Sequence, residues 1–192
     1  NKLKQRLEKK ELEKPPLKAA LQNILELYNK GLFEKALLKG NELSQHYPNE
    51  PNIANILGAT NAGLGQYDVA VLHYTKAIEL DPNNAETHNN LGAAYRNLDQ
   101  HAEAVVAYNK AIDLNPEFAA VYNNLGNVFN SLEEHDDAIK YYKKAILIKP
   151  NYYDSYVNSG AHYKDKSCHG KAMTNYNRAI LLNKNYAEAY IG

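Results

Sequence analysis

One stretch decides the fold: Ala119 to Pro150 reads AAVYNNLGNVFNSLEEHDDAIKYYKKAILIKP, and its layout recurs on both sides at a step of 34 residues. Four series of identical residues keep this step. They are Gly58, Gly92, Gly126 and Gly160; Ala36, Ala70, Ala104, Ala138 and Ala172; Tyr74, Tyr108, Tyr142 and Tyr176; and Pro48, Pro82, Pro116 and Pro150. A fixed period in this range indicates an array of stacked units rather than one globular core.

The letters of each unit resemble the tetratricopeptide repeat, a helix-turn-helix with an aromatic, Leu-Gly and Tyr on its first helix, then Ala, an aromatic and Ala on its second, and then Pro. The matching residues are Tyr122, Leu125, Gly126, Phe129, Ala138, Tyr142, Ala145 and Pro150 in one unit and His88, Leu91, Gly92, Tyr95, Ala104, Tyr108, Ala111 and Pro116 in the unit before. The resemblance extends over everything after Pro16. It implies an all-α fold, an α-solenoid wound as a right-handed superhelix of about five repeats.

Size and shape suggest roles for the repeated residues. We expect Gly126 and Ala138 where the two helices of one repeat cross closely, and Tyr142 and Phe129 in the space between neighbouring repeats. Pro150 should end one helix and could occupy the first turn of the next, where its missing N–H costs nothing.

The period divides the chain into a leader, five repeats and a remnant. Residues 1–16 form a charged leader that could be a short helix with Leu3 and Leu7 on one stripe, either solvated or docked on a partner. The repeats span residues 17–50, 51–84, 85–118, 119–152 and 153–186 in approximate register, and residues 187–192 begin a truncated sixth. The first repeat is degenerate, with helices expected near Leu17 to Asn29 and Phe33 to His46 and with Gly31 in the turn.

Net charge, cysteine content and apolar runs indicate the kind of partner and the cellular compartment. The 22 basic and 22 acidic residues give a formal net charge of zero, so no overall field favours nucleic acid or an anionic membrane. Cys168 is the single cysteine, which is compatible with a reducing cytosol. No apolar run is long enough for a transmembrane helix. We therefore expect a soluble, cytoplasmic protein whose partners are proteins or peptides.

Catalytic and metal-binding signatures are weak. His162, Asp165, Cys168 and His169 are residue types that ligate metals, but they lack the paired spacing of the usual zinc sites, and a surface turn explains them better. The sequence contains no Gly-rich phosphate loop and no GxSxG motif. We expect no enzyme activity, no cofactor and no metal in this segment.

Amides are the candidate binding groups. In the family, first helices line a concave groove, where the resemblance places Asn97, Asn130 and the seven asparagines that are the candidate binding residues: Asn55, Asn89, Asn90, Asn123, Asn124, Asn127 and Asn158. An amide can meet both the C=O and the N–H of a peptide unit. Asn90, Asn124 and Asn158 share one repeat position, similar to the asparagine ladder of the O-GlcNAc transferase superhelix. Alternatively, these residues solvate the groove and bond to neighbouring groups.

These observations favour a non-catalytic protein–protein interaction module that binds an extended peptide or a partner helix in the groove. The cations of the carboxylate clamp found in co-chaperone repeats are absent from the matching positions, so capture of a C-terminal carboxylate is disfavoured. Two alternatives stay open. One is the recognition arm of a larger glycosyltransferase or sulfotransferase, and the other is a scaffold that forms homo-oligomers through its array ends or its leader.

Overall fold

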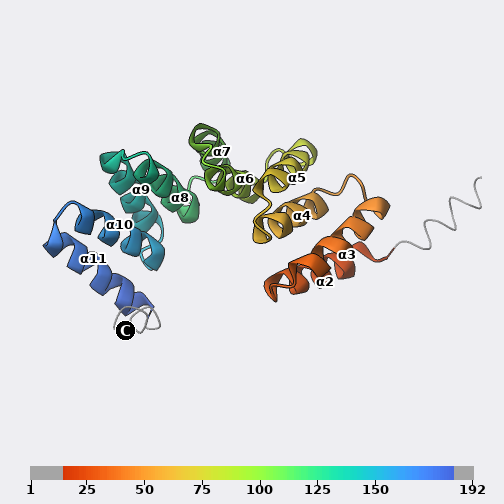
Figure 1. Ribbon diagram of the computed structural model, residues 1–192, viewed down its shortest axis with the longest axis horizontal. Helices are drawn as coiled ribbons and strands as arrows, with labels where there is room; N and C mark the ends of the chain where they lie inside the picture. Colours follow the sequence, from red (N-terminus) through yellow and green to blue (C-terminus); the bar gives the residue numbers. More distant parts are fainter. Residues whose placement is uncertain (1–14, 184–192) are drawn as a thin grey trace, which may run out of the picture. The chain divides into compact units, whose positions relative to one another are not determined.

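The computed structural model describes residues 15–183, apart from the side chain of Asp165, and this part of the chain contains ten helices and no strand (Figure 1). They are α2 (Leu17–Asn29), α3 (Phe33–His46), α4 (Pro51–Gly63), α5 (Tyr67–Leu80), α6 (Ala85–Asn97), α7 (His101–Leu114), α8 (Ala119–Ser131), α9 (His135–Ile148), α10 (Tyr153–Asp165) and α11 (His169–Leu182). The two helices predicted for the first repeat are confirmed. The leader helix and the sixth repeat lie outside the described residues.

The helices form two compact units, one ending at Leu98 and the other starting at Asp99. Unit 1 holds α2 to α6 and unit 2 holds α7 to α11, and within each unit every helix packs on the next one in the chain. The first helices of successive repeats also touch, as α2 with α4, α4 with α6 and α8 with α10. Contacts confined to one repeat and its neighbouring repeats are typical of an α-solenoid, so the predicted fold class is confirmed.

A glycine and a tyrosine join the two helices of a repeat. A Cβ atom on Gly126 would overlap the ring of Tyr142, and one on Gly58 would come within 2.6 Å of the Tyr74 ring. The missing side chain therefore lets the tyrosine ring lie against the backbone of the first helix. The Tyr142 ring thus packs on Gly126 of its own repeat, and its expected contact with a neighbouring repeat stays a prediction.

Phe129 also contacts an aromatic ring of its own repeat, and its expected contact with a neighbouring repeat stays a prediction. Its ring stacks on Tyr141 of the same repeat, with 5.1 Å between centroids and 10° between the ring planes. Ala138 is fully buried, as expected for a helix crossing. The aromatic positions thus help to hold the two helices of one repeat together.

The turn between the two helices of each repeat contains one residue with a left-handed backbone. The five residues are spaced by 34 and are Gly31 (φ 70°), Gly65 (φ 75°), Asp99 (φ 57°), Glu133 (φ 60°) and Ser167 (φ 56°). Only the first two are glycine, the residue that adopts this conformation without steric cost. The turn of the later repeats therefore carries backbone strain.

The prolines lie in the turns between repeats. Pro150 follows the end of α9, and α10 begins only at Tyr153, so the prediction that Pro150 occupies the first turn of the next helix was wrong. Its carbonyl accepts a hydrogen bond from Tyr156 Oη at 3.3 Å. The same bond recurs between Tyr122 Oη and the Pro116 carbonyl at 3.2 Å and between His88 Nε2 and the Pro82 carbonyl at 3.0 Å. The first aromatic of each of these repeats thus holds the preceding turn.

Candidate functional site

Three of the predicted amides meet between α8 and α10 in unit 2. The side-chain nitrogen of Asn158 donates to Asn123 Oδ1 and to Asn127 Oδ1, each at 3.0 Å. Asn123 is only 5% exposed, whereas Asn127 and Asn158 are half-buried. The amides therefore bond first to one another, across the boundary between two repeats.

Hydroxyl groups complete this amide cluster, which we define as Asn123, Asn127 and Asn158 with Tyr142 and Ser155. Tyr142 Oη donates to Asn127 Oδ1 at 2.8 Å, and Ser155 Oγ donates to Asn123 Oδ1 at 2.9 Å. Both carbonyl oxygens thus accept two hydrogen bonds, which fills their two lone pairs. Each of the three asparagine side chains is therefore held by two partners, which fixes the positions of the amides.

Two amide groups of the cluster have no hydrogen-bond partner among the described residues. Among the described residues, no group donates to Asn158 Oδ1 and none accepts from Asn127 Nδ2. Both side chains are half-buried rather than sealed. One acceptor and one donor therefore remain for an outside partner, on two side chains held 3.0 Å apart.

The hydrogen bonds between the predicted amides of unit 1 are longer. Asn90 Nδ2 lies 3.5 Å from Asn55 Oδ1, and Asn89 Nδ2 lies 3.5 Å from Asn90 Oδ1, both at the outer limit for a hydrogen bond. All three side chains are half-buried on α4 and α6. Asn124 of unit 2 is also half-buried, on α8. Within each unit the predicted residues therefore lie on first helices, but only those of the amide cluster have short mutual hydrogen bonds.

Sequence reasoning missed a second contact between the fourth and fifth repeats. His162 Nδ1 lies 3.2 Å from Asn130 Oδ1, and the His162 ring lies 4.9 Å from that of His135. His162 is 5% exposed. The repeat period does not predict this contact, because it aligns His162 with Ala94 and Val128, residues of another chemical type. His162 thus joins α10 to both helices of the preceding repeat.

The described side chains include no group of three or more His, Cys, Asp and Glu residues that could hold a metal ion. Cys168 is exposed, and His169 begins α11. No described helix is both long enough and apolar enough to cross a membrane.

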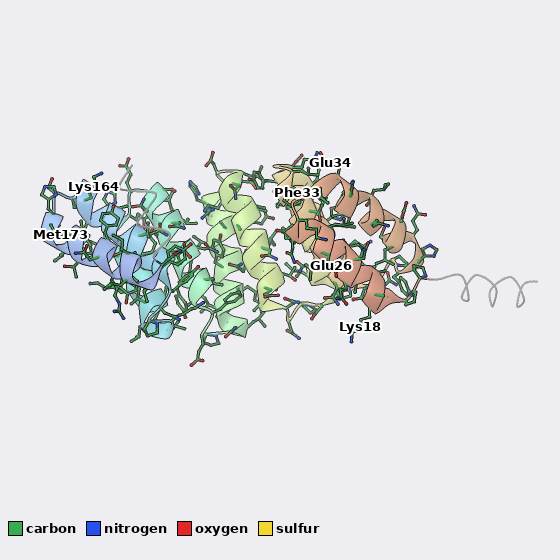
Figure 2. All side chains as sticks on the ribbon, turned by 90° about the horizontal axis from the view of Figure 1, so that it is seen from below. Lys18, Glu26, Phe33, Glu34, Lys164 and Met173 are labelled. Carbon is green, nitrogen blue, oxygen red and sulfur yellow. The ribbon has the colours of Figure 1, made fainter. Side chains whose placement is uncertain are left out.

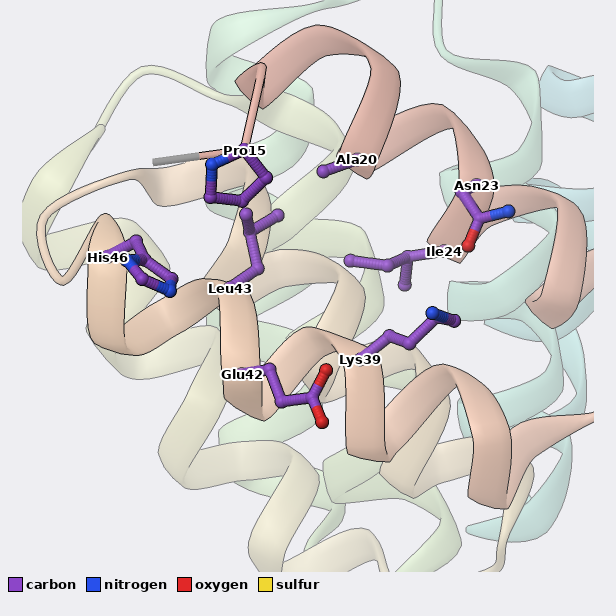
Figure 3. Close-up of a pocket in the computed structure, with 8 residues that line it drawn as sticks. All are labelled: Pro15, Ala20, Asn23, Ile24, Lys39, Glu42, Leu43 and His46. Carbon is purple, nitrogen blue, oxygen red and sulfur yellow. The ribbon is translucent and has the colours of Figure 1, made fainter. Parts of the chain in front are cut away.

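A depression at the first repeat lies apart from the amides. Figure 3 shows its lining, with Asn23 and Ile24 on α2 facing Lys39, Glu42 and His46 on α3. Its volume is about 230 Å³. None of the seven predicted asparagines lines it, so it is a separate feature of the first repeat.

Comparison with known proteins agrees with this architecture. The family model of the tetratricopeptide repeat matches residues 85–118 and 119–152, and a TPR repeat model matches residues 62–99. A search of curated protein sequences found no significant match.

Several solved structures share the fold. A crystal structure of MamA is 31% identical, with 85% of this chain and 95% of that chain covered and a TM-score of 0.71. PilF of Pseudomonas aeruginosa is 21% identical over 90% of this chain and 83% of its own, with a TM-score of 0.76. YrrB, described as a TPR protein with an unusual peptide-binding site, is 18% identical over 88% and 87%, with a TM-score of 0.64. The chain belongs to the tetratricopeptide repeat family, whose helical arrays are protein-interaction modules.

Proposed function

We propose that this array is a non-catalytic module that binds an extended peptide along its first helices, with the amide cluster of unit 2 as the central contact. The observation that carries the proposal is the pair of open amide groups on Asn127 and Asn158. Asn158 Oδ1 is an acceptor for a peptide N–H, and Asn127 Nδ2 is a donor for a peptide C=O. A fixed donor and acceptor side by side match the main chain of an extended peptide.

Preorganisation supports the proposal. A side chain that is already ordered loses little conformational freedom on binding, which leaves more of the contact energy as affinity. Asn127 is held by Tyr142, and Asn158 is held by two carbonyl oxygens. Main-chain recognition by such groups demands little of the ligand sequence. The description of YrrB as a TPR protein with a peptide-binding site is consistent with this function for the fold.

A peptide array tests the proposal. The chain would be probed against immobilised random-sequence decapeptides, and the tightest binder would be titrated by calorimetry into the wild type, Asn127→Ala, Asn158→Ala and Asn97→Ala. Asn97 is the matched control, because it is an exposed first-helix asparagine that bonds to its own helix at Ala93 O. We expect both cluster variants to bind about tenfold more weakly, since one main-chain hydrogen bond is lost, while Asn97→Ala binds like the wild type.

Loss of the fold is separated from loss of binding by circular dichroism on the same samples. A wild-type protein that retains no peptide, or folded variants whose affinity equals that of the wild type, would refute the proposal.

A further inference from the structure

A pair of equivalent depressions lies between the first and second helices of the last two described repeats, both within unit 2. The one in the fourth repeat has a volume of about 400 Å³, and the one in the fifth about 450 Å³. Their linings are Tyr122, Lys140, Tyr141, Lys143, Lys144 and Leu147 in the fourth repeat and Tyr156, Thr174, Asn175, Asn177, Arg178 and Leu181 in the fifth. Each residue of the second set follows one of the first by 34 positions, so the repeat geometry forms the depression.

The depression of the fourth repeat, which we call the lysine–tyrosine depression, has a rigid apolar floor. Tyr122 is anchored by its hydrogen bond to the Pro116 carbonyl, and Tyr141 is anchored by stacking on Phe129. Burial raises the pKa of the Tyr122 phenol, and Tyr141 raises it further, so the phenol stays neutral near pH 7. Leu147 stands beside these rings with 73% of its surface exposed. An exposed leucine beside two fixed rings forms a receptacle for a large apolar side chain.

The rim of the same depression is basic. Residues 138–153 contain four lysines and no acidic residue, and α8 has no charged residue at all. Lys140 and Lys144 place their ammonium groups 5.9 Å from the centroids of the Tyr141 and Tyr122 rings. The one ion pair here joins exposed Lys140 to Asp137 at 3.8 Å. No described carboxylate pairs with Lys143 or Lys144, so the rim has positive charge to offer a partner.

The fifth repeat supplies a natural comparison. It keeps a tyrosine and an exposed leucine, Tyr156 and Leu181, but Thr174 and Asn177 replace two of the three lysines. One tyrosine and the leucine are thus common to both repeats, whereas the second ring, Tyr141, is replaced by Asn175 and the dense positive rim is absent from the fifth repeat. Met173 of α11, labelled in Figure 2, is 62% exposed but does not line the depression.

We infer that the lysine–tyrosine depression docks an acidic peptide, which inserts one large apolar side chain against Tyr122, Tyr141 and Leu147. Carboxylates on both sides of that side chain pair with Lys143 and Lys144. Opposite charge steers the partner to the rim, and the apolar contact holds it there. A nucleic acid fits less well, because a phosphate backbone needs a positive stripe that continues along the protein, and the fifth repeat interrupts it.

This surface differs from the amide cluster in chemistry and in its residues, although α8 and α9 contribute to both. The amide cluster recognises main chain on the first helices, while the depression recognises side-chain charge and apolar bulk on a second helix. The inference therefore stands independently of the proposed peptide groove.

Fluorescence anisotropy with a labelled peptide, Asp-Glu-Asp-Phe-Asp-Glu-Asp, tests it. We expect saturable binding that weakens as salt is added, since screening acts on exposed charge pairs. A peptide with Ser for Phe, and one with Asn and Gln for the acidic residues, should each bind at least about fivefold more weakly, because each removes one of the two kinds of contact.

Charge and leucine variants locate the site. Lys143→Gln with Lys144→Gln should weaken binding about tenfold, while Lys35→Gln with Lys39→Gln, an equal charge change at exposed positions of α3, should leave it unchanged. Leu147→Ser should weaken binding about fivefold, while Leu181→Ser in the fifth repeat should not.

Four results would overturn the inference. The first is no binding of the acidic peptide, and the second is an equal loss of affinity in the lysine variants and their controls. The third is preferential binding of a labelled poly(dT) 12-mer at the same lysines. The fourth is a dimer of the free protein that the Lys143→Gln/Lys144→Gln change dissociates. The last would assign the surface to a second copy of this chain.

Discussion

Asn158 Nδ2 lies 3.0 Å from Asn127 Oδ1, so a side chain of the fifth repeat is fixed on one of the fourth. The same nitrogen also donates to Asn123 Oδ1 at 3.0 Å. These bonds lie partly out of water, where an unmet polar group is costly. The amide cluster therefore both joins two repeats and holds the groups that we propose for peptide binding.

Removal of Asn158 should weaken the array itself. Asn158→Ala deletes two hydrogen bonds and should lower the free energy of unfolding by about 2 kcal/mol, since each bond is worth roughly 1 kcal/mol. Urea unfolding followed by circular dichroism measures the change. Asn97→Ala, on an exposed position of α6, should stay within about 0.5 kcal/mol of the wild type. Equal stability of the two variants would mean that the cluster does not stabilise the boundary.

A methyl group at Gly126 should disturb the contact between α8 and α9. Its Cβ would overlap the Tyr142 ring, which is 2% exposed and has little room to move. We expect Gly126→Ala to cost about 1–3 kcal/mol. The matched control is Gly170→Ala in α11, where no atom lies within 4 Å of the added Cβ, and a gain of about 0.5 kcal/mol is expected from helix propensity. Thermal melts that rank the two variants in the opposite order would contradict this packing.

The strained turn of the fourth repeat should be improved by glycine. Glu133 has φ of 60°, a left-handed conformation that costs an L-residue about 1–2 kcal/mol. Glycine also increases the entropy of the unfolded chain, which offsets part of this gain. Glu133→Gly should therefore raise the free energy of unfolding by about 0.5–1 kcal/mol. The neighbouring Glu134→Gly, where φ is −81°, should lower it. A higher urea midpoint for the first variant alone is the expected result, and no difference between them would argue against strain.

His73 should make the first unit sensitive to mild acid. Burial, with a further contribution from Lys76, lowers the pKa of His73 below its ordinary value of 6.5 in the folded chain. The unfolded chain then binds the proton more tightly, so this contribution to stability is complete above about pH 6.5 and falls as the pH drops below it. Urea midpoints at about pH 7.5 and 5.5 should therefore differ less for His73→Gln than for the wild type. His46→Gln, at an exposed position, is the control and should show the wild-type difference.

The repeat period predicts the helices well because packing demands recur with it. The bounds of α2 and α3 follow from it even in the degenerate first repeat. It fails for contacts between repeats. Asn158 pairs with residues 35 and 31 positions earlier, and a period of 34 relates equivalent residues but does not say which different ones touch.

The left-handed turns show a second limit of sequence reasoning. Gly31 predicts a turn from the sequence, because glycine favours the left-handed conformation. Glu133 and Ser167 adopt the same left-handed conformation although neither is glycine. The packing of the two flanking helices imposes the turn there. The contact of Tyr142 with Gly126 shows a related limit, since a large ring in a repeat pattern does not reveal every neighbour that it packs against.

The most direct test of the peptide-binding claim is to follow the side-chain NH₂ signals of isotope-labelled asparagines by NMR as the tightest array peptide is added. The account predicts that the NH₂ signals of Asn127 and Asn158 shift in a saturable way, while that of Asn97 stays in place. Saturable binding of the peptide that leaves the signals of Asn127 and Asn158 unmoved would contradict the account, because the peptide would then occupy another surface.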